Sequence, residues 1–346
     1  MFKTRFKKPL QSAKRTLGHA YEARLPIAKA GLAAGLLLTT SSCTTTMPVS
    51  ARAVPQPTKP VIALVLGGGG AKGLAHVGVI KVLEASGLKP DLIVGSSVGS
   101  LVGSLYASGM TADALTQLAL TTSNEELTDF TIAHQGIIEG IKLRDFVNAQ
   151  VKSRPIEKLP IRFAAVATEN NTQQKTVFTS GNTGLVVQAS CSVPGIFIAP
   201  RIPEKVGKKY IDGGVTSLVP VDTARALGAD VIIAVDVMTD ETVNNAKVEA
   251  NNTDHQTAPN IWSLMEKGYN STYASKGKYA QSQAEVNRAE VIIRPNVAHI
   301  SSIDTSRRNE AIMAGEAAAA QSLPAIAEAI ANAVAKPSTS AATVPN

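Results

Sequence analysis

Short continuous runs of apolar residues alternate along the chain with segments whose apolar residues recur at helical spacing. Val61–Leu66 and Leu92–Val94 are such runs, each followed by glycine, as is typical of buried parallel strands. Gly73–Ser86 and Val98–Ser108 instead place their apolar side chains on one helix face. Further strands are predicted at Arg162–Thr168, Lys175–Phe178, Val231–Asp236 and Glu290–Arg294, and further helices at Leu143–Gln150, Thr183–Ala189, Val221–Leu227 and Arg307–Ala333. This alternation predicts an α/β fold, a three-layer α/β/α sandwich with a mainly parallel sheet.

Two segments do not follow this alternation. Residues 121–160 are mixed and polar, and residues 240–288 open with a polar stretch before a long helical segment. Two interpretations stay open for each: a lid or lipid-facing surface, or ordinary packing over the edge of the sheet.

The charge of the chain is concentrated at its start. The formal net charge is +7, and residues 1–42 hold eight Lys or Arg against the single acid Glu22. The rest of the chain therefore carries 26 basic and 26 acidic residues. Because the body has no basic excess to attract a polyanion, we expect no nucleic-acid partner.

The basic start resembles an export signal. A basic stretch leads to the apolar run Ala30–Leu38 and then to small polar residues before Cys43, which predicts a signal peptide over residues 1–42. The apolar run is far shorter than the ~20 residues that span a bilayer. Cys43 resembles the lipidated cysteine of bacterial lipoproteins, although Thr40 departs from the usual apolar residue. The alternative is a plain signal peptide cut near Ser50–Ala53.

A lipidated Cys43 implies a membrane partner. Thr44 is not the Asp that marks inner-membrane retention among lipoproteins, so an outer-membrane lipoprotein is expected. Residues 43–60 then form the lipidated cysteine and a Pro- and Thr-rich tether, residues 61–334 one folded domain, and residues 335–346 a disordered tail. Cys191 is the only other cysteine, which leaves no disulfide if Cys43 is acylated; we expect it to be a small buried apolar residue near the wall of a pocket.

The strongest local motif is Gly95-Ser96-Ser97-Val98-Gly99, which has the G-x-S-x-G form between a buried strand and an amphipathic helix. A nucleophile at Ser97 would occupy a strained turn, and glycine at 95 and 99 removes the side chains that would collide there. The helix N-terminus would point free N–H groups toward the serine. The alternative is a turn without chemistry.

Residues 67–73, Gly-Gly-Gly-Gly-Ala-Lys-Gly, follow the first predicted strand and open a helix. Consecutive glycines let backbone N–H groups converge on one point and hold an anion. In acyl transfer that anion is the oxygen of the tetrahedral intermediate. We expect this oxyanion hole to be formed by Gly68, Gly69, Gly70, Lys72 and Gly73.

The same loop fits nucleotide motifs less well. Gly68, Gly70 and Gly73 match the dinucleotide pattern G-x-G-x-x-G, but Asp91 lies at the beginning of the next strand rather than at its end. A Walker loop needs Ser or Thr after the lysine, and Lys72 is followed by glycine. Lys72 has two interpretations, an ammonium that helps to place an anionic phosphate or a solvated residue of the first helical turn.

The acid that such a serine needs is found at Asp212, before Gly213 and Gly214. The two glycines permit a sharp turn that could present the carboxylate at the site. An Asp in a tight turn without a catalytic role is the alternative, since Asp-Gly is common in turns.

Together the three motifs resemble those of the patatin-like phospholipases, in the same order and with similar spacing. The resemblance extends to Gly73–Gly78, Ala189–Phe197 and Pro220–Asp222 and covers roughly residues 61–297. It implies a serine hydrolase with a Ser97–Asp212 dyad, an acyl-enzyme intermediate, and acyl esters of phospholipids or lysophospholipids as substrates. It implies no metal and no cofactor. Asp212 would need a raised pKa to act as a base.

Two other functions stay open. An α/β-hydrolase-type esterase with a Ser–Asp–His triad would need a histidine after the acid, and His299 or His255 would supply it. A non-catalytic, lipid-binding envelope lipoprotein is the other. His76 follows the glycine loop and is expected to be a packing or capping residue rather than a base.

Overall fold

The computed structural model describes residues 59–133, 135–238, 265–266, 268–269, 273 and 276–335. The chain divides into two units, residues 1–54 and 55–346, and every described residue belongs to the second. The predicted signal peptide, Cys43, most of the tether and all but the first residue of the predicted tail lie outside the described residues. So does most of 240–288. No helix in the described ranges combines the length and apolarity needed to cross a bilayer.

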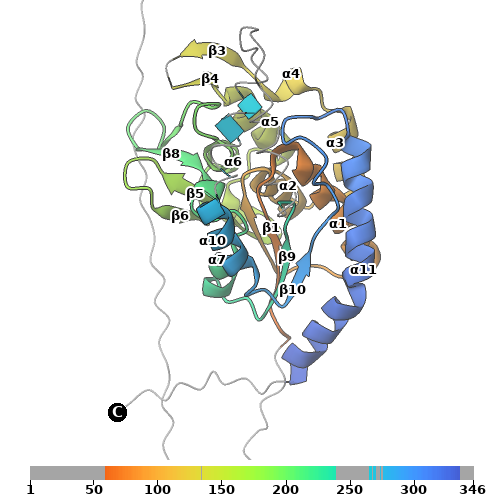
Figure 1. Ribbon diagram of the computed structural model, residues 1–346. Helices are drawn as coiled ribbons and strands as arrows, with labels where there is room; N and C mark the ends of the chain where they lie inside the picture. Colours follow the sequence, from red (N-terminus) through yellow and green to blue (C-terminus); the bar gives the residue numbers. More distant parts are fainter. Residues whose placement is uncertain are drawn as a thin grey trace, which may run out of the picture. The chain divides into compact units, whose positions relative to one another are not determined.

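The sheet of the described domain follows the order β10-β9-β1-β2-β5-β8-β7 (Figure 1). The first five of these strands are parallel, and β8 and β6 both run antiparallel to β5. The strands are β1 (Ile62–Leu66), β2 (Leu92–Ser96), β5 (Arg162–Glu169), β6 (Lys175–Phe178), β7 (Arg201–Ile202), β8 (Lys208–Asp212), β9 (Val231–Val235) and β10 (Val291–Ile293). The strands predicted from apolar runs are all present, and the mainly parallel sheet is confirmed.

Every predicted helix is present, α3 (Ala112–Thr121) is an additional helix, and one start differs. The segment predicted as a helix from Gly73 begins instead with a 3₁₀ turn, η1 (Gly70–Leu74). The longer helices are α1 (Ala75–Ala85), α2 (Val98–Ala107), α3 (Ala112–Thr121), α5 (Ile141–Gln150), α6 (Thr183–Ser190), α7 (Val221–Ala226), α10 (Lys276–Val286) and α11 (Arg308–Ala335).

The irregular segment 121–160, part of the crossover from β2 to β5, contains short elements besides α5. They are α4 (Asn124–Leu127), the hairpin of β3 (Phe130–Ala133) and β4 (Gly136–Ile138), and η2 (Ile156–Lys158). The Ile138 side chain is fully buried, and the N–H of Ile198 donates to its carbonyl at 2.8 Å. Phe130 is 53% exposed. The segment therefore packs through its second strand and leaves its first strand open to solvent.

Residues of the central strands alternate between two apolar layers. In β1, Ile62, Leu64 and Leu66 pack with α1, α2, α3, α5, α6 and α11. Ala63 and Val65 face the other side, with α7, α10 and the tyrosines 269 and 273. Both faces of the sheet are covered at its centre, so β1 and β9 are apolar throughout, and the three-layer arrangement is confirmed (Figure 1).

Helices α1 and α11 cross with their backbones in close approach. A Cβ at Gly78 would lie 1.9 Å from the carbonyl oxygen of Ile312, and a Cβ at Gly315 would lie 2.0 Å from that of Ala75. Any side chain at either glycine would push the two helices apart. Helix α1, which follows the glycine loop, is thus held in place by α11, the last helix of the described residues.

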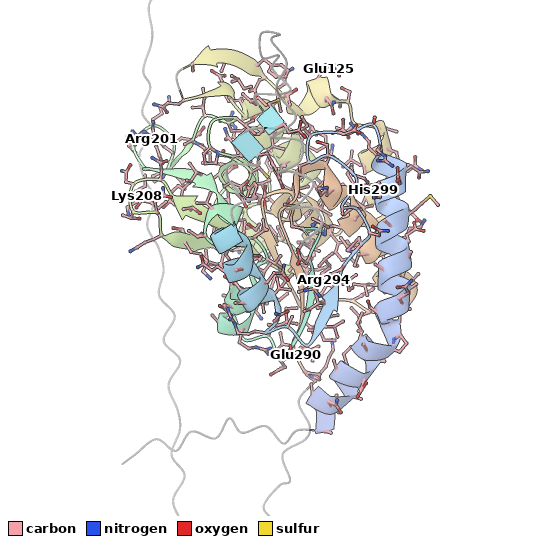
Figure 2. The ribbon with its side chains drawn as sticks, in the orientation of Figure 1. Glu125, Arg201, Lys208, Glu290, Arg294 and His299 are labelled. Atoms are coloured by element: carbon pink, nitrogen blue, oxygen red, sulfur yellow. The ribbon has the colours of Figure 1, made fainter. Side chains whose placement is uncertain are left out.

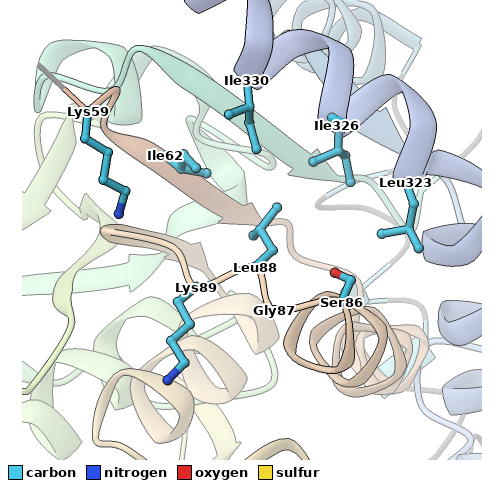
Figure 3. A pocket seen from close by; sticks show the side chains of 10 residues that line it. Lys59, Ile62, Ser86, Gly87, Leu88, Lys89, Leu323, Ile326 and Ile330 are labelled. Atoms are coloured by element: carbon cyan, nitrogen blue, oxygen red, sulfur yellow. The ribbon is translucent and has the colours of Figure 1, made fainter. Parts of the chain in front are cut away.

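An apolar groove of about 630 Å³ lies between the end of α1 and the second half of α11 (Figure 3). Leu88, Ile326 and Ile330 line it, with Lys59 at one side. It includes Ile62 at the amino end of β1, whereas Ser97 follows the carboxyl end of the neighbouring parallel strand β2. This groove therefore lies at the other end of the sheet from the catalytic motifs.

Candidate active site

Ser97 lies on a sharp turn between β2 and α2. Its backbone is in an unusual conformation, with φ +53° and ψ −130°, and its side chain is only 5% exposed. A Cβ at Gly95 would lie 2.5 Å from the Gly99 carbonyl oxygen, and one at Gly99 would lie 2.0 Å from that of Leu66. The flanking glycines are thus required by close backbone approach, as the motif predicts.

Ser190, at the end of α6, holds this turn in place. Its hydroxyl accepts the Ser97 N–H at 3.0 Å and donates to the Val166 carbonyl at 2.6 Å. Sequence reasoning assigned no role to Ser190. The signal available in the sequence was a serine at the end of an apolar helical segment, inside the residues 189–197 that carry the family resemblance; in the structure it is fully buried.

Asp212 is the last residue of β8. Strand β8 pairs with β5, where Asp212 lies opposite Ala167, and this pairing brings Asp212 beside the nucleophile turn. One carboxylate oxygen, Oδ2, accepts the Ser97 hydroxyl at 2.6 Å, and the other, Oδ1, accepts the Gly214 N–H at 2.7 Å. The Asp212 side chain is fully buried. The structure thus brings together Ser97 and Asp212, which are 115 residues apart in the chain, and Gly213 begins the short 3₁₀ turn η3 (Gly213–Val215) that follows the acid.

Burial controls the charge of this carboxylate. Loss of solvent raises the pKa of Asp212 from 3.8 to about 6, against the opposing effect of hydrogen bonds that include those from Ser97 and Gly214. The phenol of Tyr273 lies close by, and burial together with the charge of Asp212 raises its pKa well above 10. Asp212 is therefore a stronger base than an exposed aspartate and is still mostly ionised at neutral pH.

The glycine loop lies against the nucleophile, but its members differ in role. The Gly68 N–H donates to the Leu218 carbonyl at 2.9 Å, so the expectation that Gly68 supplies an oxyanion donor is wrong. Gly68 instead gives room to the serine, since a Cβ there would lie 3.2 Å from that of Ser97. Within the described ranges, no hydrogen-bond partner is found for the N–H of Gly69 or Gly70. Gly73 packs against Val98.

Both predictions for Lys72, an ammonium that places a phosphate and a solvated residue of the first turn, are wrong, because its side chain is only 2% exposed. The ammonium donates to the carbonyls of Val297 and Ala298 at 3.0 Å each and to that of Ile300. The neighbouring Ala71 N–H donates to the Ser302 carbonyl at 2.7 Å. Lys72 therefore ties the glycine loop to the segment after β10 and presents no exposed charge to a phosphate.

The histidines that sequence reasoning weighed lie apart from the dyad chemistry. His76 is fully buried, its Nε2 lies 2.8 Å from the Gly67 carbonyl, and burial lowers its pKa to about 4. It is a neutral packing residue that supports the glycine loop. His299 lies beside α11 (Figure 2), with Nε2 2.7 Å from the Glu310 carboxylate. His255 lies outside the described residues. Since Asp212 contacts Ser97 directly, the geometry favours a dyad over a triad.

Two further observations complete the site. Cys191 is a buried thiol 3.8 Å from the Ser100 hydroxyl, and burial raises its pKa. It packs as a small apolar residue, as expected. Among the described residues, no cluster of three or more His, Cys, Asp or Glu could hold a metal ion.

Comparison with known proteins extends these observations. Residues 64–225 match the family model for patatin-like phospholipase. Human patatin-like phospholipase domain-containing protein 6 is 35% identical over 182 residues, which are 51% of this chain and 13% of that protein. An uncharacterized NTE family protein of Mycobacterium tuberculosis is 37% identical over 182 residues, 51% of this chain and 49% of that protein. This chain thus spans at most half the length of either relative.

A crystal structure of VipD from Legionella pneumophila is similar in fold. The TM-score is 0.51 over 77% of this chain and 67% of that one, at 14% sequence identity. At this identity the likeness concerns the arrangement of the sheet and helices alone.

Proposed function

We propose that this protein is a serine lipid acyl hydrolase that cleaves acyl esters of phospholipids or lysophospholipids, and the match of residues 64–225 to the family model for patatin-like phospholipase supports this. The observation that carries the proposal is the buried 2.6 Å hydrogen bond from the Ser97 hydroxyl to Asp212. A serine hydroxyl held by a desolvated carboxylate is the nucleophile-and-base arrangement that acyl transfer needs.

In the proposed reaction Asp212 acts first as a base. Its Oδ2 takes the proton of Ser97 while Oγ bonds to the ester carbonyl carbon, and the carbonyl oxygen becomes negative. The C–O bond to the alcohol then breaks, and Asp212 returns the proton to the leaving alkoxide. The products of this half-reaction are the free alcohol, for example a glycerol-based head, and an acyl ester of Ser97.

The second half-reaction repeats these steps with water. Asp212 accepts a proton from water as its oxygen adds to the acyl carbon. Collapse of the intermediate breaks the bond to Oγ, and Ser97 regains its proton. The fatty acid leaves, and the enzyme is restored without any metal or cofactor in the reaction.

Backbone N–H groups would stabilise the negative oxygen in both halves. Gly69 and Gly70 are the donors of the glycine loop that have no internal partner among the described residues. Helix α2 begins at Val98, and the side chain of its N-cap residue, Ser97, forms no capping hydrogen bond. The first backbone N–H groups of α2 are therefore further candidate donors. Each well-placed donor is worth about 3 kcal/mol in the transition state.

The test is hydrolysis of a nitrophenyl ester and of a lysophospholipid by the wild type, Ser97→Ala and Asp212→Asn. We expect both variants to lose activity by at least ~10³-fold while they keep their circular dichroism spectra. Ser104→Ala on the same helix and Asp222→Asn in a surface ion pair are matched controls and should stay active. Labelling by a fluorophosphonate should require Ser97. Full activity of Ser97→Ala would refute the proposal.

We also propose that the domain is held at the outer membrane by acylated Cys43. The support is sequence alone, from the basic leader, the short apolar run and the small residues before Cys43. Expression of the full chain with radiolabelled palmitate should label the wild type and not Cys43→Ser, and Cys43→Ser should leave the membrane fraction. Equal labelling of both chains would exclude this anchor.

A further inference from the structure

A mostly apolar cavity of about 200 Å³ lies beside the glycine loop, on the face of the sheet covered by α1, α2 and α3. Its walls are formed by leucine, valine and alanine side chains on these three helices. Gly70, Leu74, Val98, Leu101, Leu105 and Leu115 are among the residues that line it.

One end of the cavity adjoins the catalytic turn. Val98 directly follows Ser97, and Gly70 follows Gly69, one of the two loop residues whose N–H has no partner in the described part of the chain. Helix α2 then leads away from the nucleophile, and the lining residues from Val98 to Leu105 extend about 10 Å along it. A chain attached to Ser97 at this end would lie along α2.

The position of α3 identifies the far end. Thr122, at the end of α3, accepts a hydrogen bond from Arg308, and both residues line the cavity together with Gly70 of the glycine loop. Leu115 lies about two turns earlier on α3 and is 2% exposed. Leu105 and Leu115 therefore close the cavity away from Ser97.

Four of the five N–H groups of Arg308, on the wall, are already used. They donate to the carbonyls of Ala119, Thr122 and Thr305 and to the Asn124 side-chain oxygen. The guanidinium therefore forms part of the wall and has at most one N–H left for a phosphate or a carboxylate. A charged head group would lose its hydration here in exchange for at most one hydrogen bond from Arg308, so the cavity fits an uncharged hydrocarbon tail.

We infer that this cavity is the acyl-chain site of the hydrolase and that its depth limits the chains that bind well to medium length. The inference rests on the proposed function of Ser97. The lining on α2 runs about 10 Å from Val98 to Leu105, which an extended chain of about eight carbons spans, since each C–C bond of about 1.5 Å advances a zigzag chain by somewhat less than its length. Each buried methylene should raise kcat/KM about fourfold until the cavity is full.

The experiment measures kcat/KM for nitrophenyl acetate, butyrate, octanoate, laurate and palmitate. For the wild type we expect a steep rise to octanoate and no further rise for laurate or palmitate. Ala119→Phe should fill the cavity and lower the octanoate-to-acetate ratio on the order of 50-fold, while acetate hydrolysis persists. Ala114→Phe, on the exposed side of the same helix, is the matched control and should leave the profile unchanged.

A second variant tests the far end. Leu115→Ala removes about three chain carbons of side chain and should raise the laurate-to-octanoate ratio on the order of tenfold. Leu83→Ala is the control, because Leu83 is equally buried in the same apolar layer but does not line the cavity.

The outcomes separate the two proposals. If the wild type hydrolyses esters through Ser97 but neither Ala119→Phe nor Leu115→Ala changes the chain-length profile, the cavity is not the acyl site and the hydrolase proposal stands. If no ester is hydrolysed and no fluorophosphonate label appears, both proposals fail. A profile that keeps rising to palmitate in the wild type would overturn the inference about depth.

Discussion

Replacement of Asp212 by Asn should abolish activity and at the same time make the folded domain more stable at neutral pH. Asn has the same shape, and its amide can face both the Ser97 hydroxyl and the Gly214 N–H that Asp212 now holds. It carries no charge to desolvate. A group kept ionised in a buried site for its chemistry destabilises the fold that holds it.

The magnitude follows from the shifted pKa. The carboxyl titrates near 3.8 in the unfolded chain and at about 6 in the folded one. A difference of about two units corresponds to about 3 kcal/mol at pH 7, at about 1.4 kcal/mol per unit. Because Asn replaces charged hydrogen bonds by weaker neutral ones, we expect a net gain of between about 1 and 3 kcal/mol.

The direction in which the stability difference between the two proteins changes with pH is specific to a buried carboxylate. Since the folded state binds this proton more tightly, Asp212 lowers wild-type stability as the pH rises from about 4 to above 6, and the loss is complete beyond that. Below about pH 4 the carboxyl is protonated in both states, so the variant and the wild type should there be equally stable. Other titrating groups, His76 included, are common to both proteins and cancel in the difference.

The assay is urea unfolding of the two proteins at several pH values from 4 to 8, followed by circular dichroism. The pH profile of wild-type kcat/KM supplies an independent check, because it should fall tenfold per unit below about pH 6 as Asp212 is protonated. A variant that is less stable than the wild type at pH 7, or a difference that does not change with pH, would refute the argument that burial sets the charge of Asp212.

Three other side chains should respond in ways that a surface residue would not. Ser190→Ala should lower kcat roughly tenfold with little change in KM, because the nucleophile turn loses the hydroxyl that holds it. Ser192→Ala should leave kcat unchanged, and equal kinetics for the two variants would contradict this role of Ser190. Lys72→Met should cost about 3 kcal/mol in urea unfolding because three buried carbonyls lose their donor, while the exposed Lys89→Met should change stability by less than ~0.5 kcal/mol; a silent Lys72→Met would show that the tether is dispensable. In the wild type, the neutral burial of His76 should remove about 3 kcal/mol of stability as the pH falls from 6.5 to about 4, and His76→Gln should flatten this slope; an unchanged slope would assign the acid sensitivity to other groups.

The sheet and most helices were predictable because their patterns record burial directly. β1 and β9 are covered on both faces and are apolar at every position, so a run of apolar residues sufficed to find them. Helix α3 was not predicted. Its buried positions, Ala112 and Leu115, are few, and the threonines among them weaken the helical pattern.

The candidate site was predictable only in part. The elbow and the glycine loop are local motifs, whereas the meeting of Ser97 with Asp212 was inferred from the family resemblance. The roles of Gly68 and Lys72 were missed because their partners come from distant segments, Leu218 for the first and residues 297–300 for the second. No local spacing reveals which carbonyl will face a given donor once the chain has folded.

The close crossing of α1 and α11 also bears on when the surroundings of the nucleophile turn can form. The glycine loop comes early in the chain, but Gly78 and Lys72 contact residues that lie about 230 positions later. At about 5 to 20 residues per second, synthesis alone separates the two segments by roughly 11 to 46 s. A chain exported before it folds, as the proposed signal peptide implies, therefore leaves the cytoplasm before the glycine loop has the contacts that hold it.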